Sequence, residues 1–180
     1  MRILIAITLI GLLAFVACNK STEPENVLIL TDSFERFGNP TVTGWQVNSD
    51  SSLFSGDTPE GGDIFSLRLF PGNTSEGTAS KLITADHGDG VYRFSVWGKR
   101  SQDQPSHTGY VRFCVIRDNI LTQSTQFELT DTAWTEYAVT DTLSFEPDDR
   151  IQIFLSCGYS EEPASWHSYF DLVTIEKLAE

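Results

Sequence analysis

The stretch VYRFSVWGK, residues 91–99, alternates between apolar and polar side chains. Successive side chains of a β-strand point to opposite faces, so Tyr92, Phe94 and Val96 share one face. The opposite face is polar except for one tryptophan, and carries Arg93, Ser95, Trp97 and Lys99. This period of two is typical of a strand with one buried face, and differs from the 3.6-residue period of an amphipathic helix.

The same alternation recurs along the rest of the chain. Residues 151–157, IQIFLSC, place Ile151, Ile153 and Leu155 on one face. Turn-forming residues at 87–90 and 118–119 separate such stretches. Further strands are expected at 64–70, 79–84, 110–117, 120–129, 134–140 and 169–176. This many short strands predicts an all-β fold, an antiparallel β-sandwich of the jelly-roll kind.

Composition narrows the class of protein. The chain has 180 residues, of which 25 are acidic and 12 basic, so its formal net charge is −13. Nucleic-acid binding needs clustered Lys and Arg, and this balance argues against it. At 40% hydrophobic residues the chain is too apolar to be disordered, and its length suits one folded domain.

The N-terminus has the pattern of a secretory signal. Arg2 precedes an apolar run at 3–17, which is shorter than the roughly 20 residues of a membrane-spanning helix. Cys18 follows Ala17 directly and resembles the lipidation site of bacterial lipoproteins, in which the cysteine becomes the mature N-terminus. Asn19 is not the Asp that retains such proteins on an inner membrane, so the resemblance implies an outer membrane or cell-surface location. The alternative is an ordinary secretory signal with a cysteine beside its cleavage site.

This interpretation divides the chain into three parts. Residues 1–17 are a lipoprotein signal peptide, and residues 18–26 form a polar tether lipidated at Cys18. Residues 27–178 form the β-sandwich domain. The lipid is the only predicted membrane contact, because no second long apolar span follows the N-terminus.

A series of short motifs resembles the galactose-binding-like jelly rolls, in particular carbohydrate-binding modules of the family 4/9 type. The resemblance covers essentially the whole domain and keeps the family's order. Its landmarks are DSFE at 32–35 followed by GW at 44–45, GDIFSLRL at 62–69, YRFSVWGK at 92–99, WTEY at 134–137 and YFDLV at 169–173. The resemblance implies a glycan-binding sandwich, although this fold hosts many functions.

Glycan binding needs flat aromatic faces flanked by polar groups that hydrogen-bond to hydroxyls. Trp97 is the strongest candidate, because strand parity places its indole on a polar face. If parity holds from strand to strand, the same face also carries Arg93, Tyr110, Arg112, Gln152 and Phe154. The alternative is a satellite core covered by loops. Trp166 either edges the site or covers the sandwich, whereas Trp45 and Trp134 match family positions that are normally in the core.

A structural Ca²⁺ is the predicted cofactor. In the resembled modules such an ion ties the first strand to the last, and Glu35 and Asp171 occupy matching positions, with Asp32 nearby. Carboxylate oxygens suit this ion. The alternative is a solvated acidic surface. Cys114 and Cys157 are predicted to be buried free thiols, since parity places them on opposite faces of their strands.

Motifs of catalysis are missing from the sequence. It has no His-Glu-x-x-His or Cys-x-x-Cys spacing, no Gly-x-Ser-x-Gly elbow and no phosphate-binding loop. We therefore expect a glycan-binding lipoprotein without enzymatic activity, with a polysaccharide as its partner. The alternative is a lipoprotein that uses the same sandwich for protein interaction or envelope structure.

Overall fold

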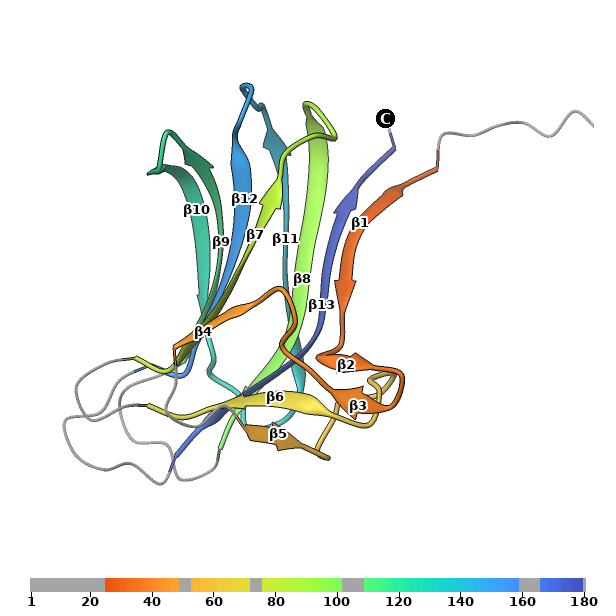
Figure 1. Cartoon of the computed structure of the whole chain (residues 1–180), viewed down its shortest axis with the longest axis vertical. Coiled ribbons are helices and arrows are strands. Elements are labelled where there is room, and N and C mark those ends of the chain that lie inside the picture. The colour runs from red at the N-terminus through yellow and green to blue at the C-terminus, as the bar shows by residue number, and fades with distance from the viewer. Residues whose placement is uncertain (1–24, 49–52, 72–75, 102–108, 159–165, 180) are drawn as a thin grey trace, which may run out of the picture.

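The computed structural model describes residues 25–48, 53–71, 76–101, 109–158 and 166–179 (Figure 1). Every strand pairing among them is antiparallel, which confirms the predicted all-β sandwich. In these ranges no helix is long and apolar enough to span a membrane.

Two sheets face each other in Figure 1. The first, called the β9 sheet, has the order β10-β9-β12-β7-β4, with bounds Ile120–Glu128, Tyr110–Arg117, Arg150–Ser156, Thr78–Thr84 and Gln46–Asn48. The second, called the β8 sheet, has the order β11-β8-β13-β6-β5, with bounds Thr135–Leu143, Gly90–Arg100, Ser168–Lys177, Ser66–Leu69 and Leu53–Ser55. Strand β1, Val27–Asp32, also pairs with β13, and a small hairpin joins β2, Glu35–Arg36, to β3, Asn39–Pro40.

The core lies between the sheets, where the sequence pattern placed it. Tyr92, Phe94 and Val96 of β8 are buried, and so are the inward side chains of β12, Ile151, Ile153 and Leu155. Burying a side chain of this size stabilises the fold by about 1.5–3 kcal/mol. The alternation in both stretches therefore reflects one face packed on the core.

Strand β13 changes partners half-way along one of its edges. Ser168, Tyr169 and Phe170 pair with β6, whereas the strand's second half pairs with β1. A bulge separates Asp171 from Thr174 in the pairing with β8, and Leu172 there has a φ of 45°. The bulge leaves Asp171 buried beside the start of the β2–β3 hairpin.

Both cysteines of the sandwich are buried and free, as predicted. Cys157 packs in the core, and burial raises the pKa of its thiol to about 12. Cys114 lies on the outer side of β9, where its Sγ is 3.6 Å from the backbone oxygen of Gln152. The two thiols are therefore held as inert, protonated groups on opposite sides of one sheet.

Candidate functional site

The outer face of the β9 sheet brings together four of the residues that the sequence singled out. The pairing register puts Arg112 opposite Phe154, Tyr110 opposite Ser156, and Cys114 opposite Gln152. Residues paired across antiparallel strands point to the same side of a sheet. We call this group, Tyr110, Arg112, Gln152 and Phe154, the platform.

The rings of the platform lie nearly parallel. Tyr110 and Phe154 have ring centroids 5.9 Å apart and an interplanar angle of 18°. The guanidinium carbon of Arg112 lies 4.8 Å from the Phe154 centroid and 5.8 Å from that of Tyr110. Its Nε is buried without a hydrogen-bond partner, and none of the ion pairs among the described residues includes Arg112. Among the described residues, the guanidinium of Arg112 therefore packs on the two rings and has no ion-pair partner.

A carboxylate fixes the edge of the platform. The Tyr110 hydroxyl donates to Glu76 Oε2 at 2.7 Å, and Ser156 Oγ donates to the same oxygen at 3.0 Å. Burial, followed by the hydrogen bond to Glu76 and its negative charge, raises the pKa of Tyr110 to about 12. The phenol stays neutral at physiological pH and keeps the proton that it donates to Glu76. The hydrogen bond therefore persists at that pH and holds the ring in place.

Trp97 and Arg93 do not belong to the platform. They lie on the outer face of β8, which pairs with β11 and β13 and forms part of the other sheet. Arg93 makes an ion pair there with Glu136 at 2.8 Å. The prediction that Trp97 shares a face with Tyr110 and Arg112 is wrong, because β8 and β9 are consecutive in the chain but belong to opposite sheets.

The structure places the other three tryptophans in two different environments. Trp45 is 8% exposed and packs in the core, as predicted. Trp166 is 2% exposed and packs in the core, which fits the alternative that it covers the sandwich. Trp134 was expected in the core, but it is half-buried on the outer face of the β8 sheet, where its Nε1 donates to Asp57 at 3.0 Å.

The predicted calcium ligands converge around the bulge in β13. Oδ2 of Asp171 is buried without a hydrogen-bond partner, and burial followed by the negative charges of Asp63, Asp32 and Glu35 raises the pKa of Asp171 to about 7. A hollow of about 480 Å³ opens here and is lined by Asp32, Glu35 and Asp63 among others. An unpartnered carboxylate oxygen beside further carboxylates fits the oxygen-donor chemistry of Ca²⁺.

The fit is better for some of these residues than for others. Asp32 Oδ2 already accepts hydrogen bonds from Lys81 Nζ at 2.9 Å and Trp45 Nε1 at 2.8 Å, and its Oδ1 accepts from the Phe34 backbone N–H at 3.0 Å, so both oxygens are occupied. Glu35 accepts from the backbone of Ile64, and Asp63 from the Ser33 hydroxyl. The described residues hold no group of three or more Asp, Glu, His or Cys already arranged around one metal position. Asp63 was missed from the sequence because nothing there places its turn beside Asp171.

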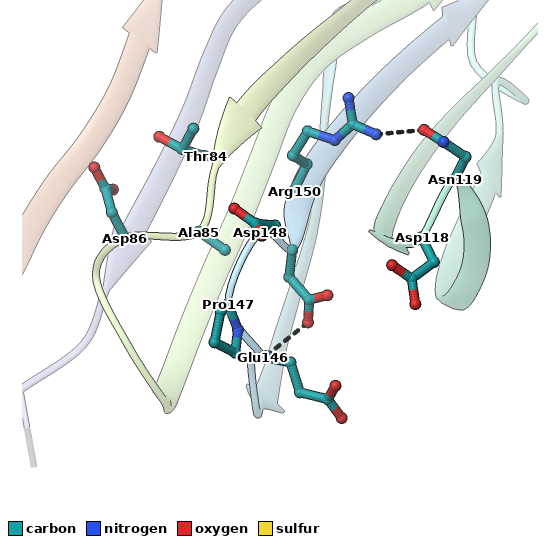
Figure 2. Close-up of a pocket in the computed structure, with 10 residues that line it drawn as sticks. Thr84, Ala85, Asp86, Asp118, Asn119, Glu146, Pro147, Asp148 and Arg150 are labelled. Carbon is teal, nitrogen blue, oxygen red and sulfur yellow. Dashed lines mark hydrogen bonds between the residues drawn. The ribbon is translucent and has the colours of Figure 1, made fainter.

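A larger hollow lies at the opposite end of the sandwich (Figure 2). Its volume is about 670 Å³, and Arg150 donates to Asn119 at 2.7 Å along its wall. The carboxylates of Asp86, Asp118 and Asp148 line it, and its described lining includes no aromatic ring. It therefore lacks the flat apolar surface on which a sugar ring stacks.

Comparison with known proteins shows which solved structures have a similar fold. The sequence matches no protein-family model and no curated protein. Among solved structures, the CBM22-1 xylan-binding domain of Paenibacillus barcinonensis Xyn10C is similar, with a TM-score of 0.59, 17% sequence identity, and coverage of 87% of this chain and 97% of that chain. The chain has the fold of a carbohydrate-binding module.

Two further modules support this conclusion. TmCBM61, solved in complex with β-1,4-galactotriose, has a TM-score of 0.53 at 15% identity and covers 81% of this chain and 94% of its own. The C-terminal family 22 module of Clostridium thermocellum Xyn10B has a TM-score of 0.53 at 14% identity, with 84% and 94% covered. The resemblance to the 4/9 type stays a prediction.

Proposed function

We propose that this protein is a non-catalytic glycan-binding module that binds a polysaccharide on the platform of the β9 sheet. The observation that carries the proposal is the parallel pair of Tyr110 and Phe154 with the Arg112 guanidinium over it. The two half-buried rings on the outer side of the sheet offer sugar rings an apolar surface, while Arg112 and Gln152 supply donors and acceptors for hydroxyls.

The platform replaces Trp97 as the stacking surface. Its rings are half-buried, so they are held in place and still present surface to a ligand. The pairing register adds the polar side chains of Gln126 and Ser80 on either side of the Arg112–Phe154 pair. A few polar groups around an apolar centre is the usual composition of a site for a small ligand.

The test is affinity electrophoresis through gels that contain soluble xylan, β-1,4-galactan or other neutral polysaccharides. Phe154→Ala is expected to weaken retardation by at least about tenfold in affinity, as for a central aromatic contact. Phe37→Ala is the matched control, since Phe37 is 90% exposed at the tip of the β2–β3 hairpin and away from the platform. Retardation unchanged in Phe154→Ala would contradict the proposed platform. No retardation by any polymer would favour the protein-binding alternative.

We further propose that the module is lipid-anchored at Cys18 on an outer membrane or cell surface. The sequence of residues 1–18, which lie outside the described residues, is what supports this proposal. Mass spectrometry of the membrane fraction is expected to find a lipid on Cys18. Cys18→Ser is expected to release the protein into the soluble fraction, and a variant that stays membrane-bound would contradict the anchor.

A structural Ca²⁺ beside the β13 bulge completes the proposal. Asp171 and Glu35 would hold the ion, together with Asp63, and the ion would supply charge neutralisation between the first and last strands. The unpartnered Oδ2 of Asp171 supports this site. Its role is stability, so calcium is not expected to contact the glycan.

A further inference from the structure

A second group of aromatic and cationic side chains lies on the outer face of the β8 sheet. The register puts Tyr169 of β13 between Lys99 of β8 and Arg68 of β6. Thr135 pairs with Gly98, so Trp134 lies beside Lys99 in the same row. Leu69 pairs with Ser168, which places Phe70 beside His167 in the next row. We call Trp134, Tyr169, His167 and Phe70 the aromatic ladder.

The rings of the ladder are in continuous contact. Ring centroids are 6.1 Å apart for Trp134 and Tyr169, 4.8 Å for Tyr169 and His167, and 5.1 Å for His167 and Phe70. A hydrogen bond of 2.6 Å joins His167 Nε2 to the Tyr169 hydroxyl. All four side chains are half-buried, which leaves part of each on the surface. Packing with the core does not explain them, because they lie on the side of the sheet that faces away from it.

The charge of this face differs from that of the platform. Lys99 Nζ lies 5.2 Å from the Trp134 centroid and 4.9 Å from that of Tyr169, and is paired with Asp57 at 2.5 Å. Arg68 lies 5.1 Å from the Phe70 centroid, and its Nε is buried without a hydrogen-bond partner. No ion pair among the described residues includes Arg68. Among the described residues, the charged side chains that contact the ladder's rings are Arg68 and Lys99, and Asp57 pairs with Lys99, so the guanidinium of Arg68 is left without a counter-charge.

The platform is not positive in this way. Arg112 is its cation, while Glu76 is hydrogen-bonded to Tyr110 and Glu128 lies opposite Tyr110 on β10. Both faces therefore place an arginine over a phenylalanine beside further aromatic rings, but they differ in the charged groups around that pair. The guanidinium of Arg68, which pairs with no carboxylate of the described residues, makes its end of the ladder complementary to a negatively charged ligand.

We propose that the aromatic ladder is a second glycan-binding site, selective for acidic polysaccharides that carry carboxylate or sulfate groups. A sugar ring stacks on Tyr169 or Trp134, and the acidic group pairs with Arg68. The inference rests on the proposed function in taking a glycan as the ligand, but it concerns the opposite sheet. The two sheets pack on each other through their inner faces, about 10 Å apart, so their outer faces point in opposite directions. The two sites would therefore bind separate polysaccharide segments.

The test uses the chain from residue 18 onward with Cys18→Ser, in gels containing polygalacturonate, alginate or chondroitin sulfate, and in parallel gels containing the neutral polymers. Arg68→Gln removes the free charge, and Arg112→Gln is its matched control on the other face. Arg68→Gln is expected to lower affinity for an acidic polymer by about tenfold and to leave neutral-polymer binding unchanged, as for a lost charge-assisted hydrogen bond. Arg112→Gln is expected to do the reverse.

Two further results complete the test. Trp134→Ala is expected to reduce acidic-polymer binding as well, with circular dichroism and the melting temperature checking that each variant is folded. Retention by an acidic polymer is expected to weaken at high salt more than retention by a neutral one. Acidic-polymer binding that is lost in Arg112→Gln and kept in Arg68→Gln would overturn the inference. Retention by neutral polymers without any acidic one would overturn it too and leave the platform standing, whereas retention by no polymer would remove both.

Discussion

The two outer faces of this sandwich carry the same side-chain types in different electrical surroundings. On the β9 sheet, Tyr110 and Phe154 lie beneath Arg112, with Glu76 bonded to the tyrosine. On the β8 sheet, Trp134 and Tyr169 lie beside Lys99, with Arg68 over Phe70. The two faces therefore resemble each other in their rings and differ in the charged groups beside those rings, and we expect that difference to decide which glycan each face binds.

The largest expected effect compares the two sides of one strand. Leu155 and Phe154 are neighbours on β12, but Leu155 is fully buried and Phe154 is half-buried on the platform. Leu155→Ala is expected to lower the free energy of unfolding by about 2–5 kcal/mol, because it leaves a cavity in the core. Phe154→Ala is expected to cost less than Leu155→Ala in urea denaturation and to lose binding instead. Equal losses of stability would mean that Phe154 is a core residue and the platform a satellite core.

Calcium is expected to raise the stability of the fold and to leave glycan binding on both faces unchanged. An ion bound only by the folded state at 100 times its dissociation constant adds about 2.7 kcal/mol, or roughly 5–10 °C in melting temperature for a domain of this size. Asp171→Asn is expected to abolish the rise seen on adding calcium. If calcium instead changes retardation in polysaccharide gels without changing the melting temperature, the ion belongs to a glycan site.

Intrinsic fluorescence distinguishes the faces in the unmodified protein. The platform contains no tryptophan, whereas Trp134 belongs to the ladder. Acidic polysaccharides are expected to change tryptophan emission, and neutral ones are expected to leave it nearly unchanged. Trp134→Phe should remove the response. A strong response to neutral polymers that survives in Trp134→Phe would contradict the assignment of neutral glycans to the platform.

The smallest expected effect is a pH dependence that belongs to the platform. The pKa of Tyr110 is raised to about 12 in the folded state, above the value of about 10 for a free tyrosine. Its contribution to stability is therefore present below pH 10 and is lost as pH rises through 12. Tyr110→Phe is expected to reduce the loss of stability over this window in denaturant titrations. An unchanged pH profile would show that Tyr110 does not titrate differently in the folded and unfolded states.

The sequence predicted which side chains share a face within one strand, but not which strands share a sheet. Parity along residues 91–99 correctly separates Tyr92 from Trp97, because alternation is a local property of the backbone. Whether β8 and β9 pair with each other depends on long-range contacts that leave no mark on either strand. The prediction that Tyr110 and Phe154 share a face is therefore confirmed, and the prediction that Trp97 shares it is wrong.

The sequence pattern also failed to predict short strands and the positions of turn residues. Strands β2 to β5 have two or three residues each, which is too few to show a period of two, and none of them was predicted. Strand β6 lies within the strand expected at 64–70. Asp63 precedes the expected strand at 64–70 and Phe70 ends it, but the sequence does not show which strand lies beside either residue, so neither was recognised as part of a surface. The ladder became visible only when the register of β13 placed Trp134, Tyr169 and Phe70 together.

Binding of a glycan on the outer face of the β9 sheet is tested most directly by amide chemical shifts. The ¹⁵N-labelled protein would be titrated with a short neutral oligosaccharide, such as xylohexaose or β-1,4-galactotriose. We expect the shifted amides to cluster on β9 and β12 around Tyr110, Arg112 and Phe154. Shifts confined to β8 and β13, or to the acidic hollow around Asp148, would contradict it.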